Sequence, residues 1–187
     1  MRARSALLLL AAICAGPADA RPLRAPVVSL GCQGEGCFDR GNWLVTKALP
    51  LYARPFAAKA LATLPKGTRL TVLGGQIWTT RIGTAVLNKE VANYDPNGKL
   101  LIRLPRVSRI RLLYSEGEGY FAGRAADGRD VTIVQDDFRV LVNFRATDWV
   151  SVRLADGRRG WIRHDYEALD CSSYYDDSPI CLTLNPR

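Results

Sequence analysis

Residues 149–161, WVSVRLADGRRGW, are the stretch that decides the fold class of this chain. Val150, Val152 and Leu154 alternate with polar or small residues, which is the period of a strand with one buried face. The Asp156-Gly157 pair favours a tight turn, because glycine reaches positive φ without steric cost. The stretch therefore predicts a β-hairpin with a tryptophan on each strand, typical of a small antiparallel β module.

Short strands are also expected along most of the remaining chain. Apolar alternation and β-branched runs predict strands within 49–52, 68–73, 100–104, 110–114 and 131–134. Turn-forming residues separate these runs, most clearly at Asp95-Pro96-Asn97-Gly98 and Asp127-Gly128. Helix signals are weak, and we read no long repeat in the sequence. Many short strands separated by turns indicate an all-β barrel or sandwich.

The N-terminal residues 1–20 have the three parts of a secretory signal peptide. Arg2 and Arg4 give a basic start, residues 7–13 are apolar, and Ala18-Asp19-Ala20 fits a cleavage site. The apolar run is too short for an ordinary transmembrane helix. We therefore expect a periplasmic or secreted protein with no transmembrane segment.

Cysteine usage fits an oxidising compartment. After the expected cleavage four cysteines remain: Cys32, Cys37, Cys171 and Cys181. An even number in an exported chain predicts two disulfides. Local pairing is the simplest of the three connectivities, and the sequence leaves the connectivity open. Both local spacings exceed that of a zinc knuckle, so we expect no metal site.

The formal net charge is +8, with arginines spread along the chain rather than in one run. Such a charge favours contact with anionic polymers or lipid headgroups, and it also serves plain solubility. No nucleic-acid motif accompanies the arginines, so no nucleic-acid partner is expected. No phosphate-binding loop, dinucleotide fingerprint or metalloprotease motif is present, so no cofactor is expected either.

Two parts of the chain resemble the two halves of a bacterial SH3-like (SH3b-type) domain. Residues 49–55, LPLYARP, followed by 60–73, ALATLPKGTRLTVL, resemble its opening half. Residues 149–161, with Ile162 and Tyr166, resemble its closing half, and 114–120, YSEGEGY, resemble an exported subgroup of uncharacterised function. The resemblance implies an SH3-like small antiparallel barrel, in which the two halves close onto each other.

The spacing of the two halves departs from the ordinary pattern. Residues 76–147 lie between them, so we expect one barrel with a long β insertion; the alternative is two tandem SH3-like barrels. The expected organisation begins with a signal peptide at 1–20 and an N-terminal disulfide loop segment at 21–42. The SH3-like β domain follows at 43–170 and includes the insertion at about 76–147, and a disulfide-tied tail occupies 171–187.

The resemblance implies a non-catalytic module of the bacterial cell envelope that binds peptidoglycan or a peptide. Aromatic side chains with one wet edge suit stacking on a sugar ring or a peptide, and Tyr52, Tyr120 and Trp149 are the expected contact residues. We expect Trp149 to be half exposed and Trp161 to lie in the core.

Two other functions remain open. The first is a protein-interaction or inhibitor module that acts on another envelope protein through the insertion. The second, less favoured, is a cell-wall hydrolase acting through His164, the only histidine, or through the Glu116 and Glu118 carboxylates. Acidic residues beside glycine are common in turns, so we expect no enzymatic activity.

Overall fold

The computed structural model describes residues 23–31, 33, 41–164 and 169–170. Antiparallel strands dominate this part of the chain, and it contains no α-helix. The all-β expectation is therefore confirmed. The expected signal peptide, the C-terminal tail and the four cysteines expected to form disulfides lie outside the described residues.

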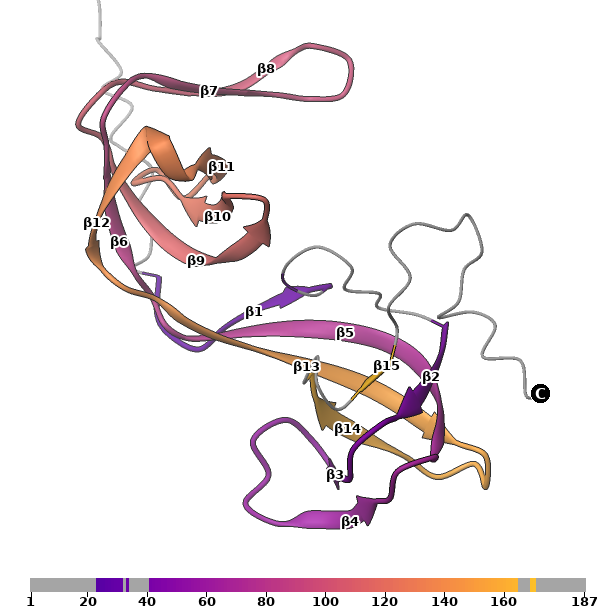
Figure 1. The fold of residues 1–187 in the computed structure, drawn as a ribbon. Helices are drawn as coiled ribbons and strands as arrows, with labels where there is room; N and C mark the ends of the chain where they lie inside the picture. The colour runs from indigo at the N-terminus through magenta and orange to yellow at the C-terminus, as the bar shows by residue number, and fades with distance from the viewer. Residues whose placement is uncertain (1–22, 32, 34–40, 165–168, 171–187) are drawn as a thin grey trace, which may run out of the picture.

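Eight strands form the largest sheet, in the order β15-β2-β5-β13-β14-β3-β4, with β1 paired to β5. Together they build a terminal lobe, seen in the lower part of Figure 1. Its strands are β1 (Val27–Leu30), β2 (Gly41–Val45), β3 (Leu49–Tyr52), β4 (Ala60–Leu64), β5 (Arg69–Arg81), β13 (Arg145–Leu154), β14 (Arg159–Arg163) and β15 (Leu169–Asp170).

A second group of strands forms the inserted lobe, residues 82–144, in the upper part of Figure 1. A five-stranded sheet has the order β11-β10-β9-β6-β12, and β7 pairs with β8 as a separate hairpin. The elements are β6 (Thr84–Leu87), β7 (Val91–Tyr94), β8 (Leu100–Leu104), β9 (Arg109–Gly117), β10 (Tyr120–Arg124), β11 (Asp130–Val134), the 3-10 turn η1 (Gln135–Asp137) and β12 (Phe138–Val142).

A long two-stranded ribbon joins the lobes. Strands β5 and β13 pair from Leu70 with Leu154 to Arg81 with Arg145. The residues expected as an insertion, 76–147, thus include the far ends of this ribbon as well as the inserted lobe. The two segments that resemble an SH3-like domain are also neighbours, because β14 pairs with β3 through Trp161 and Tyr52.

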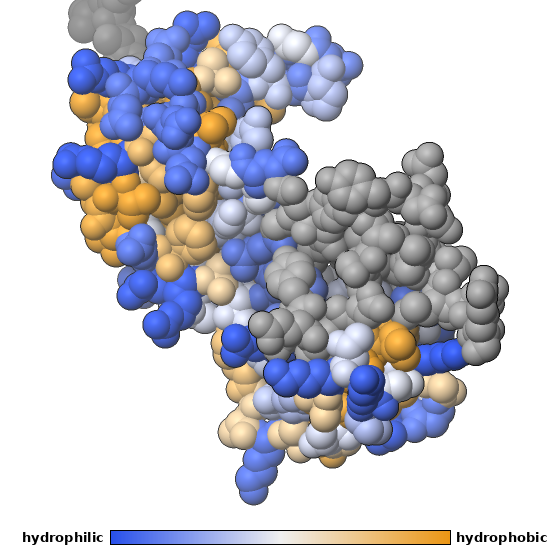
Figure 2. Space-filling view, viewed as in Figure 1, coloured by the Kyte–Doolittle hydropathy of each residue, from blue (hydrophilic) through white to orange (hydrophobic). Residues whose placement is uncertain are grey.

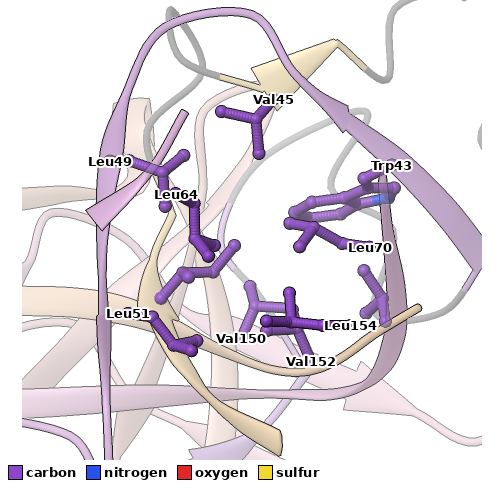
Figure 3. Packing of buried hydrophobic residues seen from close by; sticks show 11 residues of the cluster. Trp43, Val45, Leu49, Leu51, Leu64, Leu70, Val150, Val152 and Leu154 are labelled. Carbon is purple, nitrogen blue, oxygen red and sulfur yellow. The ribbon is translucent and has the colours of Figure 1, made fainter. Parts of the chain in front are cut away.

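Each lobe has its own hydrophobic core. The alternation of Val150, Val152 and Leu154 is buried as predicted, together with Ile162 from the opposite strand. Figure 3 shows how Val150, Val152 and Leu154 converge with other side chains of this core inside the terminal lobe. That core consists of Trp43, Val45, Leu49, Leu51, Leu64, Leu70, Val72, Val150, Val152, Leu154 and Ile162. The second core consists of Ala85, Leu87, Val91, Ile102, Leu104, Ile110, Leu112, Ala125, Val131, Ile133 and Phe138.

Both tryptophan expectations for the hairpin are wrong. Trp161 is half exposed, because its strand neighbour Ile162 is the residue that points inward. Gly160, on the other side of Trp161, also faces inward and must be small, because a Cβ there would lie 2.6 Å from Leu51 Cδ1. Trp149 is only 4% exposed although it lies on the face opposite Val150, because other aromatic rings cover it.

The two lobes repeat one topology, a repeat that we did not read in the sequence. Each lobe has a first strand (β2 or β6), a hairpin (β3–β4 or β7–β8) and a three-stranded meander (β5-β13-β14 or β9-β10-β11). A final strand, β15 or β12, then returns to pair with the first strand. The inserted lobe lies within the β5–β13 hairpin of the terminal lobe, so one copy is nested inside the other.

Local contacts repeat as well. The turn before β5, LPKGTR at 64–69, matches LPRVSR at 104–109 before β9. Thr68 Oγ1 donates to Pro65 O at 2.7 Å, and Ser108 Oγ donates to Pro105 O at the same distance. Gly67 and Val107 both have positive φ, 86° and 65°.

The Asp-Gly turns of the two meanders are also alike. Arg158 Nε donates to Asp156 Oδ2 at 2.7 Å, and Arg129 Nε donates to Asp127 Oδ2 at 2.9 Å. The arginine hydrogen bonds hold the pKa of both carboxyls below the usual range. The strand registers that lead into these two turns match as well. Tyr120 therefore occupies the position in the inserted lobe that Trp149 occupies in the terminal lobe.

Candidate functional site

Four aromatic rings gather on the outer face of the terminal lobe. Trp149, on β13, is 5.4 Å from Tyr52, at the end of β3, and 5.2 Å from Phe56, measured between ring centroids. Phe56 also lies 5.6 Å from Trp78 on β5. We call these four residues the aromatic cluster. Separations and edge-on orientations of this kind are favourable for aromatic pairs.

A groove of about 550 Å³ runs along this cluster. Tyr52, Phe56 and Trp149 form its apolar wall, and exposed Arg163 on β14 supplies a cation at its border. The other lining residues are Leu49, Pro50, Ala57 and Thr147. An apolar concave surface with a few polar groups is the usual form of a ligand site.

Phe56 covers the groove from a turn that does not suit its side chain. Ala57 N donates to Arg54 O at 3.2 Å, closing a β-turn over Pro55 and Phe56. Pro55 suits the second position of such a turn, but the third has φ of 55°, which glycine adopts more easily. A bulky residue held there costs about 1–2 kcal/mol and is found mainly at functional positions. The exposed ring, 49% accessible, thus lies on Trp149 despite local strain.

The indole of Trp149 carries a buried donor without a partner. Its Nε1 atom is inaccessible to solvent and has no hydrogen bond. Among the described residues, Trp43 Nε1 is likewise buried without a hydrogen bond, and Trp43 belongs to the core of the terminal lobe. The Trp149 indole lines the groove against the Phe56 ring, where a ligand acceptor that reached this donor would pair with it. An unsatisfied buried donor costs about 1–3 kcal/mol, so such an acceptor would be favoured.

The structure places the three expected contact residues at two sites. Tyr52 and Trp149 meet in the groove, whereas Tyr120 lies on β10 of the inserted lobe, 44% exposed. Phe56 and Trp78 are cluster members that the sequence reading missed. The Pro55-Phe56 pair between two strands was a usable signal for Phe56, because a turn displays its side chains at the surface.

His164 has a structural environment. Its side chain is 5% exposed, its ring centroid lies 5.4 Å from that of Trp43, and its Nδ1 atom is 3.8 Å from Asp148 Oδ2. Both Asp148 carboxylate oxygens accept hydrogen bonds from Gln33, each 2.9 Å long. The pair therefore ties β13 and β14 to the N-terminal segment and does not open onto the groove.

The two glutamates named for the hydrolase alternative differ in position. Both are exposed, but Glu116 lines a hollow at the end of β9, whereas Glu118 lies in the β9–β10 turn with φ of 47°. Among the described residues no group of His, Cys, Asp or Glu side chains could hold a metal ion. No helix in that part of the chain is long and apolar enough to cross a membrane.

Comparisons with protein-family models, with curated proteins and with solved structures found no match.

Proposed function

We propose that this chain is a non-enzymatic, SH3-like binding module of the bacterial cell envelope that recognises peptidoglycan or a peptide. The pairing of the Leu49–Tyr52 strand with the tryptophan hairpin supports the SH3-like part of this proposal. The observation that carries the binding function is the aromatic groove, in which strained Phe56 packs on the ring of Trp149, whose buried indole N–H has no hydrogen bond.

The groove suits an extended ligand with apolar groups and hydrogen-bond acceptors. Apolar parts of a peptide, proline rings included, pack on tyrosine and tryptophan faces, as in grooves that bind extended segments. A ligand carbonyl or hydroxyl oxygen would accept from Trp149 Nε1, and Arg163 would pair with a ligand carboxylate. Peptide carbonyls and carboxylates are both present in peptidoglycan stem peptides.

The test is co-sedimentation with insoluble peptidoglycan at low salt. The wild-type protein is expected in the pellet, and Phe56→Gly is expected to weaken binding about tenfold, because aromatic anchors carry most of the binding energy. Glycine is the right replacement here, since it removes the ring and adopts the positive φ without strain. Leu61→Ala is the matched control, because Leu61 is 61% exposed on β4 and does not line the groove.

Wild-type protein that stays wholly in the supernatant would exclude peptidoglycan as the ligand. Equal sedimentation of Phe56→Gly and wild type would exclude the groove as the site. Trp149→Phe distinguishes the contribution of the indole N–H from that of aromatic packing, because it keeps a six-membered aromatic ring and removes the pyrrole ring with its N–H.

A second candidate function, recognition of another envelope protein, is favoured by strand β12. It ends the five-stranded sheet and exposes Val140, Leu141 and Val142 by 43–49%. Figure 2 shows apolar atoms gathered on this side of the inserted lobe. A free apolar edge accepts an extended segment of a partner as an added strand.

Co-purification of a stoichiometric envelope protein that is lost in Leu141→Lys and kept in Phe56→Gly would support this second function. Unchanged co-purification by Leu141→Lys would exclude the β12 edge as the docking surface.

A further inference from the structure

The inserted lobe has a hollow of about 650 Å³ on the outer face of its meander, to which Ser29 of β1 also contributes. Tyr94, Leu101, Tyr114 and Thr132 line it, together with Glu116 and the Arg124–Asp130 pair. Tyr94 ends β7 as Tyr52 ends β3, so the hollow contains the counterpart of an aromatic-cluster residue.

The repeat explains why this face is hollow. In the β13–β14 hairpin of the terminal lobe, Ser151 is paired with Trp161. The equivalent pair in the β10–β11 hairpin of the inserted lobe is Ala122 with Thr132. The inserted lobe thus has a small residue at the position where the terminal lobe has an indole. Both Ala122 and Thr132 line the hollow.

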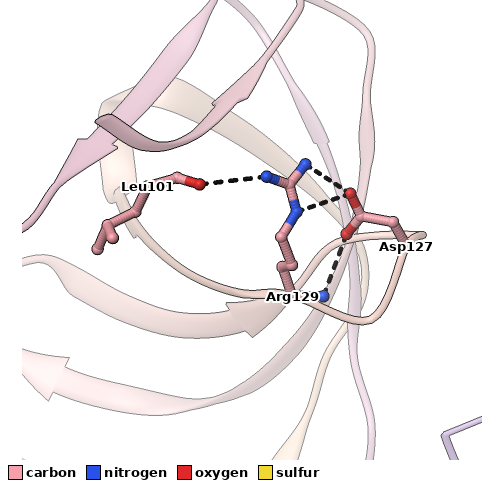
Figure 4. Close-up of polar contacts among 3 residues, drawn as sticks. All are labelled: Leu101, Asp127 and Arg129. Carbon is pink, nitrogen blue, oxygen red and sulfur yellow. Dashed lines mark hydrogen bonds and ion pairs between the residues drawn. The ribbon is translucent and has the colours of Figure 1, made fainter. Parts of the chain in front are cut away.

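Hydrogen bonds hold the walls of this hollow in place. Asn93 Nδ2 donates to Thr132 O at 2.8 Å, and Thr132 N donates to Asn93 Oδ1 at 3.1 Å, which fixes β7 against β11. Arg129 Nη1 donates to Leu101 O at 3.1 Å while its Nε and Nη2 bind Asp127 Oδ2, as Figure 4 shows. The β7–β8 hairpin is therefore anchored at two points, and the site is formed before any ligand arrives.

The hollow is negative on a chain whose net charge is +8. Burial raises the pKa of Tyr114, and the charge of Glu116 raises it further. A hydrogen bond with the Ser29 side chain lowers this pKa in part, and the charge of Asp130 adds a smaller increase. Arg124 Nε lies 2.8 Å from Asp130 Oδ1 and balances that charge. Glu116 is exposed, lines the hollow and has no ion-pair partner among the described residues.

We propose that this hollow is a second binding site, which takes a cationic side chain of a peptide, an ammonium or a guanidinium group, between Tyr94, Tyr114 and Glu116. Tyrosine faces attract such cations, and a carboxylate at the same place adds a charge-assisted hydrogen bond. Tyr114 stays neutral over a wider pH range because its pKa is raised. The site does not depend on the function proposed for the aromatic groove.

The test titrates the full chain with Nα-acetyl-lysine N-methylamide at low ionic strength, followed by amide NMR shifts. The charged probe is expected to shift the amides of Tyr94, Tyr114 and Glu116. Its Nε-acetylated form, which lacks the charge, is expected to bind about fivefold more weakly. Glu116→Gln should weaken binding of the charged probe about fivefold, and Tyr94→Ala about threefold.

Glu118→Gln is the matched control, because it removes an exposed carboxylate next to the end of β9 but outside the hollow. Equal binding of the charged and neutral probes would overturn the proposal, as would equal losses in Glu116→Gln and Glu118→Gln. Lysine binding lost in Phe56→Gly would also overturn it, because the probe would then occupy the aromatic groove. Lysine binding with no sedimentation on peptidoglycan would leave this site standing and remove only the function proposed for the groove.

Discussion

Replacing Ile162 with alanine is expected to lower the free energy of unfolding of the terminal lobe by about 2–5 kcal/mol and to leave the inserted lobe folded. Ile162 is fully buried between the strands of the terminal core, and none of its core neighbours comes from 82–144. The inserted lobe is continuous in sequence and has a separate core. Its strands do not need the terminal lobe to bring them together.

Tryptophan fluorescence distinguishes the two lobes. All four tryptophans, Trp43, Trp78, Trp149 and Trp161, lie outside residues 82–144. In Ile162→Ala the fluorescence transition is therefore expected at lower urea than the loss of amide protection at Ile110 and Ile133. Arg159→Ala, an exposed change in the same strand, is the control and should shift stability by no more than about 0.5 kcal/mol. Simultaneous loss of both signals in Ile162→Ala would show that the lobes unfold as one unit.

The strands that close the terminal lobe could be predicted because their signals are local. The Val150, Val152 and Leu154 alternation fixes which side chains enter the core, and Asp156-Gly157 fixes the turn between β13 and β14. The same pairing could have corrected the expectation for Trp161. Trp161 faces Ser151 across the hairpin, and Ser151 belongs to the polar set of the alternation.

The repeat was not predicted from the sequence because its two copies are nested. The first half of one copy is followed by the whole of the other and only then by its own second half, so no fixed period exists. Substitutions hide the match further. Val107 stands at the positive-φ position where the first copy has Gly67, and Ala85 stands in the second core where Trp43 stands in the first.

The candidate site was only partly predictable for a related reason. Tyr52 and Trp149 are far apart in sequence, and the pairing of β3 with β14 brings them together. Trp149 is buried because Phe56 reaches it from a loop, and strand periodicity carries no information on such a contact. Tyr120 carried the same aromatic signal, but it belongs to the nested copy and lies on the other lobe.

Replacing Ile110 with alanine is expected to destabilise both lobes, in contrast to the change at Ile162. Ile110 is fully buried in the second core, so the direct loss for the inserted lobe is about 2–5 kcal/mol. When that lobe is folded, it holds the ends of β5 and β13 side by side. When it unfolds, residues 82–144 become a flexible loop, and closing a loop of that length costs about 3–4 kcal/mol in chain entropy. The terminal lobe must then bear that cost.

The expected result for Ile110→Ala is one urea transition at a lower midpoint, in which tryptophan fluorescence and amide protection at Ile133 and Val152 change together. Arg109→Ala, an exposed neighbour on β9, is the control and should leave the midpoint nearly unchanged. Tryptophan fluorescence that keeps its wild-type midpoint while Ile133 loses protection would mean that the β5–β13 ribbon is stable without the inserted lobe. Because the inserted lobe lies within a hairpin of the terminal lobe, the terminal lobe needs the inserted lobe to be folded, whereas the inserted lobe does not need the terminal lobe.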